Sequence, residues 1–392
     1  MTTTLAEICE MTPGFAFKSK DFGDYPDKVV KITQINPPTV NMENLQGVDL
    51  SGYNKEKLKK YIVSQGDYIL AMTGATIGKI GRIESGTAYL NQRVLLFRAK
   101  AGVDPDFLYY VLSSRDFQQY IFSHIDSESA QPNISAGTIG KYVIDVPDIT
   151  KQQVIGRMLR SIDEKRELNT QINNNLLDQA LTLYATYFAK SDKNGFIGDY
   201  CTIKSGFAFK SSWWTDNGVK VIKIGSINQD NLNLAECSYV DVDKIDKAKD
   251  FKVGAGDLLI AMTGATIGKF AMVPYCTETL LVNQRVGKFF LGDNPVEKLP
   301  FIYCTLKQPN VYYEIVNRGQ GSAQPNISAA DIMSIPCVIP TADVLNTFND
   351  TVQPLFDLII TNQQENQRLS ELRDTLLPKL ISGELDVSDI QF

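Results

Sequence analysis

Short apolar runs between turn residues dominate two stretches of the chain. Tyr68–Met72 and Leu258–Met262 are such runs, each with Gly-Asp before it and Thr-Gly after it, which predicts strands. Further strands are predicted at Leu90–Phe97 and Leu281–Phe290, and the apolar period of Phe107–Phe122 predicts a helix. Together these patterns favour an α+β fold.

Each of these stretches is followed by a long segment of helical period, residues 151–189 and 345–377, in which Pro354 is the one proline. Their apolar seams coincide at a constant offset of 193 residues. The seam positions are Ile155, Leu159, Ile162, Arg166, Asn169, Asn173 and Leu176 in the first segment and Phe348, Val352, Leu355, Ile359, Asn362, Asn366 and Leu369 in the second.

Polar residues in a helix seam cost stability and fix the register of the pair. The matched asparagines Asn169, Asn173, Asn362 and Asn366 therefore predict that the two helices pair with each other. If the second helix returns to the first domain, the pair is antiparallel and the molecule has a pseudo-twofold axis. The alternative is two unrelated amphipathic helices, each packed on its own domain.

Four short motifs occur twice, in the same order and at offsets of 190 to 193 residues. They are GFAFKS (Gly14–Ser19, Gly206–Ser211), AMTGATIGK (Ala71–Lys79, Ala261–Lys269), NQRV (Asn91–Val94, Asn283–Val286) and SAQPNISA (Ser129–Ala136, Ser322–Ala329).

A period of this length is a domain plus a connector, because solenoid repeats span only about 20–50 residues. The predicted division is a first domain at 1–150, a helix at 151–190, a second domain at 191–340 and a second helix at 341–392. Ser135 and Ser328 are expected to cap short helices after the last repeated motif.

Composition narrows the class of protein. The six cysteines are scattered without a CxxC motif, and we expect a cytoplasmic protein with reduced thiols, no signal peptide and no membrane span. Net charge is −6, but the acidic excess lies in residues 341–392, which carry three basic and nine acidic residues. The near-neutral domains can bind DNA only through local basic faces.

The duplicated motifs, together with the final LLPKLISGEL (Leu376–Leu385), resemble the specificity (S) subunit of type I restriction–modification enzymes. The resemblance implies two homologous α+β target-recognition domains joined by two long antiparallel coiled-coil helices. It also implies that each domain reads half of a split site in double-stranded DNA. The first helix departs from this pattern, since it ends in LTLYATYFAK instead of LLPKL.

The resemblance further implies partners: two methyltransferase (M) subunits and, through the complex, restriction (R) subunits. S-adenosylmethionine, ATP and Mg²⁺ are expected on those partners, with no cofactor and no enzyme activity in this chain. The alternatives are a tandem protein-interaction scaffold or an orphan S-like regulator without DNA specificity of its own. A self-contained methyltransferase or nuclease is the hypothesis with the least support, because the chain has a single histidine and its MTGATIGK motif lacks P-loop spacing.

The DNA-binding candidates are basic residues in or near the repeated motifs, where they can contact phosphate. They are Lys18, Lys20, Lys31, Lys79, Arg82 and Arg93 in the first domain and Lys210, Lys220, Lys223, Lys269 and Arg285 in the second. Arg93 and Arg285 are predicted on strands, with a structural hydrogen-bond network as the competing role.

Residues that read bases are expected where the two copies differ, because a reader present in both copies would read the same base twice. Residues 20–60 and 212–250 share almost nothing, and neither do 98–128 and 290–321. The candidates in these variable segments are Tyr25, Gln34, Asn36, Trp213, Trp214 and Asn228.

Overall fold

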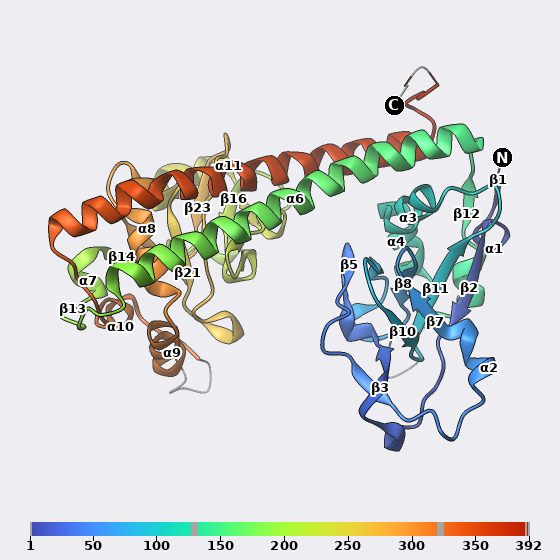
Figure 1. Cartoon of the computed structure of the whole chain (residues 1–392). Coiled ribbons are helices and arrows are strands. Elements are labelled where there is room, and N and C mark those ends of the chain that lie inside the picture. The colour runs from blue at the N-terminus through green and yellow to red at the C-terminus, as the bar shows by residue number, and fades with distance from the viewer. Residues whose placement is uncertain (1, 127–131, 320–324, 389, 391–392) are drawn as a thin grey trace. The chain divides into compact units, whose positions relative to one another are not determined.

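The computed structural model describes residues 2–126, 132–319, 325–388 and 390, and the chain divides into two compact units. Unit 1 comprises Met1–Asp163 and Ser370–Phe392, and unit 2 comprises Glu164–Leu369. Sheets and helices occur in both units (Figure 1), as the α+β prediction requires. The C-terminal end of the chain thus belongs to the same unit as its first 163 residues.

Unit 1 contains twelve strands among the described residues. They are β1 Thr2–Thr4, β2 Cys9–Pro13, β3 Phe22–Val30, β4 Ile35–Asn36, β5 Thr39–Val40, β6 Gln46–Val48, β7 Ile62–Ser64, β8 Tyr68–Ala71, β9 Ile80–Arg82, β10 Thr87–Leu90, β11 Val94–Ala99 and β12 Val143–Asp145. The short helices are α1 Leu5–Ile8, α2 Lys55–Leu58, α3 Pro105–Ser113, α4 Arg115–Ser123 and α5 Ala136–Gly140.

Two larger sheets form the body of unit 1, in the orders β2-β11-β8-β9-β5-β4 and β6-β3-β10-β7. Strand β10 pairs in parallel with β3, whereas β11 pairs antiparallel with β2 and β8. The β8 run Tyr68–Ala71 is buried at every residue, as its continuous apolar sequence predicts. Its side chains contribute to apolar cores on both sides of the sheet.

Unit 2 has thirteen strands among its described residues. They are β13 Gly195–Phe196, β14 Thr202–Ser205, β15 Trp214–Thr215, β16 Val219–Ile222, β17 Ile227–Asn228, β18 Asn231–Leu232, β19 Ser238–Val240, β20 Lys252–Val253, β21 Leu258–Ala261, β22 Phe270–Met272, β23 Leu280–Val282, β24 Val286–Phe290 and β25 Pro336–Cys337. Its shorter α-helices are α7 Ile197–Tyr200, α8 Pro295–Leu306, α9 Pro309–Arg318 and α10 Ala329–Met333.

The strand pairing of unit 2 repeats that of unit 1. Its sheets have the orders β14-β24-β21-β22 and β15-β19-β16-β23-β20, so β24, β21 and β23 take the places of β11, β8 and β10. Strand β23 pairs in parallel with β16, as β10 does with β3. The sequence repeat is therefore a repeat of topology, which confirms two homologous domains.

Three of the predicted elements are interrupted. The strands expected at 90–97 and 281–290 are each interrupted at 91–93 and 283–285. Asn91 and Asn283 form single β-bridges there, and a turn at 92–93 and 284–285 leads from one sheet to the other. The helix expected at 107–122 is two helices, because Ser114 is extended and its hydroxyl accepts a hydrogen bond from the amide of Phe117 (3.2 Å). The caps at Ser135 and Ser328 are confirmed.

The two long helices are α6 (Ile149–Phe188) and α11 (Ala342–Ile381), and α11 continues through Pro354. In unit 2 they lie side by side (Figure 1), with Asn169 and Asn173 of α6 in contact with Asn366 and Asn362 of α11. Residue numbers rise along one helix as they fall along the other, so the pair is antiparallel. None of the described helices is both long enough and apolar enough to span a membrane.

Candidate nucleic-acid interface

The repeated motifs of unit 1 are joined to one another at the point where the two sheets meet. Residues far apart in sequence become neighbours there, although Ser129–Gln131 of the last motif lie outside the described residues. Four backbone hydrogen bonds connect the motifs: Phe15 N–H to Leu90 O (2.9 Å), Gln92 N–H to Phe15 O (2.8 Å), Met72 N–H to Arg93 O (2.9 Å) and Gly74 N–H to Pro132 O (3.1 Å).

Unit 2 contains the same set of connections, here called the motif frame in both units. Ser322–Gln324 of its last motif also lie outside the described residues. The four bonds are Phe207 N–H to Val282 O (2.8 Å), Gln284 N–H to Phe207 O (2.9 Å), Met262 N–H to Arg285 O (3.0 Å) and Gly264 N–H to Pro325 O (2.9 Å). The identical sequences thus build an identical frame, in agreement with their interpretation as scaffold.

Glycines of the motifs are required by this geometry. A Cβ atom on Gly14 would lie 1.9 Å from the carbonyl oxygen of Asn91, and one on Gly206 would lie 2.4 Å from that of Val282. Gly74 and Gly264 have a φ of 71°, a conformation that side-chain-bearing residues rarely adopt. The motifs are glycine-rich because backbone segments approach one another closely and turn sharply.

The turn between the two sheets carries exposed polar side chains in both units. Gln92 and Arg93 of unit 1 are exposed, as are Gln284 and Arg285 of unit 2. The prediction that the arginines lie on strands is wrong, since both lie in the turn, and Arg93 has a positive φ of 71°. Each arginine is therefore exposed to solvent on a turn and not held within a strand.

Lys79 and Lys269 end the GATIGK loops of the motif frame. Lys79 is exposed and Lys269 is half-buried. Their backbone carbonyls accept hydrogen bonds from Ala71 (2.9 Å) and Ala261 (2.8 Å), which fixes the loop against the strand before it. These loops therefore hold one basic residue each in the same place relative to the motif frame.

Unit 1 has a cluster of aromatic side chains beside its motif frame, called the unit 1 aromatic patch. Its members are Phe15, Phe17, Phe22, Tyr53 and Tyr89, with ring centroids 4.9–6.2 Å apart.

Three of the predicted lysines adjoin this patch. Lys18 and Lys20 are exposed, and the backbone N–H of Lys18 donates to the hydroxyl of Tyr53 (3.2 Å). The ammonium group of Lys31 lies 4.0 Å from the ring centroid of Phe22 and donates to Gln46 Oε1 (2.6 Å). Aromatic faces thus support cations at the edge of the patch.

The unit 2 aromatic patch consists of Phe207, Phe209, Trp213 and Trp214. The ammonium group of Lys223 lies 3.5 Å from the ring centroid of Trp214, and burial lowers the pKa of this lysine. Lys210 lies 5.8 Å from the ring centroid of Trp213. The position of the patch matches that in unit 1, but tryptophans replace phenylalanine and tyrosine.

Sequence reasoning missed two lysines in this region. Lys244 and Lys247, in the 3-10 segment Val242–Phe251, place their ammonium groups 5.7 and 5.2 Å from the ring centroid of Trp213. The lysine-rich sequence of this segment lies in the variable part of the repeat, and this was the signal that could have found them.

Two predicted residues do not fit an exposed basic surface. Arg82 is only 7% exposed, and its guanidinium lies over the ring of Tyr109 (5.1 Å) and 3.8 Å from Asp106. Burial of its side chain on strand β9 therefore disfavours the predicted contact of Arg82 with DNA. Lys220 is ion-paired with Glu278 at 2.6 Å, which neutralises its charge locally.

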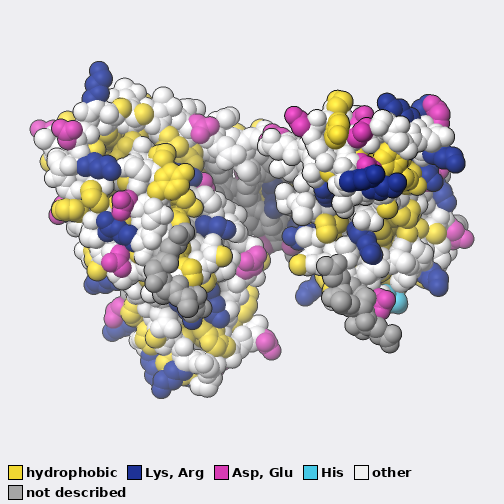
Figure 2. All heavy atoms as spheres, turned by 90° about the horizontal axis from the view of Figure 1, so that it is seen from below, with side chains coloured by type: hydrophobic (Ala, Val, Ile, Leu, Met, Phe, Trp, Pro, Cys, Tyr) yellow, Lys and Arg dark blue, Asp and Glu magenta, His cyan; other side chains and the backbone are white. Residues whose placement is uncertain are grey.

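Figure 2 shows one face of each unit, on which Lys and Arg side chains are dispersed with Asp and Glu between them. This distribution agrees with the near-neutral charge of each domain. No group of three or more His, Cys, Asp or Glu residues in the described part of the chain is arranged to hold a metal ion.

The four asparagines predicted to set helix register meet in unit 2. Asn169 Nδ2 donates to Asn366 Oδ1 (3.0 Å) and to Glu365 Oε2 (2.6 Å), and Asn362 Nδ2 donates to Asn173 Oδ1 (2.8 Å). Asn169 and Asn362 are buried. Two matched amide pairs therefore lie within the seam between the two helices.

The fold and these surfaces define a class of protein: two copies of one recognition domain, each with an exposed basic turn, on a paired-helix scaffold. The family model of the type I restriction modification DNA specificity domain matches the chain twice, over residues 1–178 and 192–372. The chain belongs to this family and carries two of its domains.

Curated relatives agree with this assignment. The chain is 27% identical over 352 residues to the type I restriction enzyme MjaIX specificity subunit of Methanocaldococcus jannaschii, covering 82% of this chain and 78% of that protein. It is 23% identical to the HindI specificity subunit of Haemophilus influenzae, covering 93% and 96%.

One solved structure shares the fold over the whole length. It is the type I restriction–modification S subunit from M. genitalium, with a TM-score of 0.54 at 16% identity, and the match covers 99% of this chain and 96% of that one. At this identity the likeness concerns the fold alone.

Proposed function

We propose that this chain is the DNA specificity subunit of a type I restriction–modification complex and reads a bipartite, asymmetric site with one domain per half-site. The observation that carries the proposal is the motif frame. It is the same in both units, it presents an exposed Gln-Arg turn in each, and it adjoins patches that differ between them. One frame with two different surfaces is what an asymmetric ligand requires.

Under this proposal the frame contacts phosphate. Arg93 and Arg285 on the turns, with Lys79 and Lys269 on the loops, occupy equivalent places in the two units. Phosphate contacts position a protein on DNA without carrying sequence information, so both halves can share them. Arginine and lysine are the usual donors to phosphate oxygens.

Base reading is assigned to the variable segments around the aromatic patches. The basic residues beside the patches, Lys20 and Lys31 in unit 1 and Lys223 and Lys247 in unit 2, are further candidates for phosphate contacts. Tyr25, Asn36 and Asn228 are exposed, whereas Trp213 and Trp214 are half-buried within their patch. The tryptophans therefore hold nearby lysines in place, and the exposed polar residues are the better candidates for base contacts.

We also propose that the chain works in a complex. The relatives it matches are named as specificity subunits of type I restriction enzymes. By that relationship two methyltransferase subunits and the restriction subunits would supply catalysis, with S-adenosylmethionine, ATP and Mg²⁺ bound by those subunits. This chain would contribute sequence recognition and the scaffold on which they assemble.

A segment exchange tests the proposal directly. Residues 20–128 of this chain are replaced by the corresponding segment of a relative, and methylated sites are mapped genome-wide in cells that carry the partner subunits. One half-site should change while the other half-site and the spacer stay the same. A change in both half-sites contradicts the two-reader model, and binding of protein partners without sequence preference favours an interaction scaffold.

A further inference from the structure

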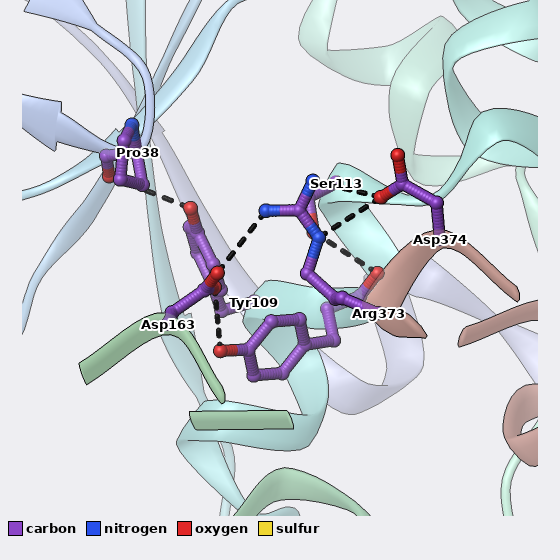
Figure 3. A network of polar contacts seen from close by, with 7 residues as sticks. Pro38, Tyr109, Ser113, Asp163, Arg373 and Asp374 are labelled. Atoms are coloured by element: carbon purple, nitrogen blue, oxygen red, sulfur yellow. Dashed lines mark hydrogen bonds and ion pairs between the residues drawn. The ribbon is translucent and has the colours of Figure 1, made fainter. Parts of the chain in front are cut away.

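Helices α6 and α11 meet the body of unit 1 through a buried polar junction (Figure 3). The carboxylate of Asp163 on α6 accepts from the hydroxyl of Tyr110 on α3 (2.8 Å) and from the guanidinium of Arg373 on α11 (3.1 Å). Arg373 also donates to Asp374 (2.7 and 3.0 Å). The side chain of Asp163 is 3% exposed and that of Arg373 is 25% exposed.

The equivalent junction of unit 2 is apolar. The offset of 193 residues places Phe356 where unit 1 has Asp163, Ala180 where it has Arg373, and Tyr303 where it has Tyr110. The rings of Phe356 and Tyr303 pack edge to face with centroids 5.2 Å apart, and Ala180 is fully buried. The hydroxyl of Tyr303 donates to Asp230 instead of to a residue of the long helices.

The four asparagines alone do not determine whether α6 pairs with α11 or with α6 of a second chain. The offset converts Asn169 into Asn362 and Asn173 into Asn366, so each amide pair maps onto the other. Two copies of α6 from two chains would place Asn169 of one opposite Asn173 of the other. The amide pairs fix register equally well in such a like-with-like pair.

We infer that the Asp163–Arg373 pair determines the partner of α6, so that it pairs with α11 and not with α6 of a second copy of this chain. In a pair of two α6 helices, Ala180 takes the place of Arg373, and each Asp163 loses its guanidinium. In a pair of two α11 helices, Arg373 faces Phe356 without that carboxylate. Loss of one member of a buried ion pair is strongly unfavourable.

Two further observations act in the same direction. Lys165 and Glu365 form an ion pair at 3.3 Å, and in two paired α6 helices Lys165 would face Ile172 instead. Both side chains are nearly half exposed, so this pair discriminates less. Burial opposes the charge of Arg373, but Asp163 and Asp374 outweigh it and raise the pKa of the guanidinium. Arginine stays protonated even without such partners, so a mismatched pair would leave its charge in place.

An engineered disulfide between two chains can detect the pairing of one α6 helix with the α6 helix of another chain. Cysteines at positions 165 and 172 of one helix are about 10 Å apart at 1.5 Å per residue, too far for a disulfide within that helix. In two paired α6 helices they lie opposite each other, because 172 corresponds to 365. The variant Lys165→Cys/Ile172→Cys is made in the full chain, with Cys276→Ser to remove the one native cysteine that is not buried.

Each protein is unfolded in urea, refolded with reductant at micromolar concentration and then oxidised, and the covalent dimer is quantified. With Asp163 and Arg373 present, little dimer is expected. With Asp163→Leu/Arg373→Leu, which makes the first junction apolar like the second, the dimer should rise about tenfold or more. Charge reversal in one chain, Asp163→Arg/Arg373→Asp, restores the pair and should return the dimer to its original level.

Lys165→Cys/Glu365→Cys is the matched control, because it forms an intrachain disulfide when α6 and α11 pair as in the structure. If the apolar double variant does not give this disulfide, Asp163→Asn/Arg373→Gln replaces it, since that variant keeps hydrogen-bonding groups without charge. The inference would be overturned if the chain with Asp163 and Arg373 and the variants without these charges gave equal dimer yields, including no dimer in either. The outcome does not depend on DNA binding.

Discussion

Units 1 and 2 share a motif frame but differ in their aromatic patches and in their helix junctions. Their motif frames have the same hydrogen bonds, whereas the aromatic patch contains Phe22 and Tyr53 in one and Trp213 and Trp214 in the other. The helix junction is ionic in unit 1 and aromatic in unit 2. Duplicated sequence therefore preserves backbone geometry, and these differences lie in the aromatic patch and in the helix junction.

The largest expected effects come from the two junctions. Arg373→Ala leaves Asp163 buried without its guanidinium and should lower the stability of unit 1 by about 3–5 kcal/mol. Phe356→Ala empties a fully buried aromatic site and should cost unit 2 a similar ~3–5 kcal/mol for a different reason.

Both tryptophans of the chain, Trp213 and Trp214, lie in unit 2, so their fluorescence follows unit 2 alone, whereas circular dichroism follows both units. Arg373→Ala should produce an earlier dichroism transition without an earlier fluorescence transition, and Phe356→Ala should shift the fluorescence transition. A matching shift of the fluorescence transition in Arg373→Ala would show that the units do not unfold separately.

Much of this architecture was predictable, because repeats and periods are written in the sequence. The offset of the four motifs revealed two domains, and the asparagines that survive the 193-residue shift indicated the helix pair. The buried state of Arg82 was not predictable, because it depends on Tyr109 and Asp106 from a distant helix. The turn at Arg93 was also missed, because the apolar residues before Asn91 and after Arg93 gave the segment the pattern of a continuous strand.

The next effect tests whether the motif frame is the same in both units. Gly14→Ala and Gly206→Ala each push a methyl group into a carbonyl oxygen, and both should destabilise their own unit by about 2–3 kcal/mol. Gly52→Ala and Gly225→Ala are the controls, because a Cβ there meets nothing within 4 Å, and they should change stability by less than about 1 kcal/mol. Urea unfolding followed by dichroism and fluorescence measures all four. A large loss in one unit only would show that the frames are not equivalent.

Smaller effects are expected from the lysines beside the aromatic patches. Lys18→Ala and Lys20→Ala in unit 1, and Lys223→Ala in unit 2, should each reduce the salt slope of duplex binding by about 1 if each neutralises one phosphate. Lys220→Ala is the matched control, because Glu278 already pairs with that ammonium group. Binding isotherms at several salt concentrations give the slopes. If Lys220→Ala changes the slope as much as Lys223→Ala does, proximity to the patch does not identify the phosphate contacts.

The smallest predicted effect concerns the helix pair in unit 2, and it depends on pH. A hydrogen bond from Asn169, with a further contribution from Lys165, holds the pKa of Glu365 below its ordinary value of 4.5. A carboxylate whose pKa is lowered in the folded state stabilises that state above its unfolded pKa, and this stabilisation is lost as pH falls through the folded pKa. Because the side chain of Glu365 is nearly half exposed, the effect should be less than about 1 kcal/mol.

Glu365→Gln keeps an oxygen that can accept from Asn169 but removes the charge that attracts Lys165. At neutral pH the native chain should therefore be slightly more stable than the variant, and the difference should disappear in acid. Lys165→Gln should change little when added to Glu365→Gln, because its partner is already absent. Urea midpoints from tryptophan fluorescence, which reports unit 2, measure the difference. A gap that is the same at neutral and acidic pH would assign the contribution of Glu365 to packing alone, and the discrimination between α6 and α11 would then depend on Asp163 and Arg373.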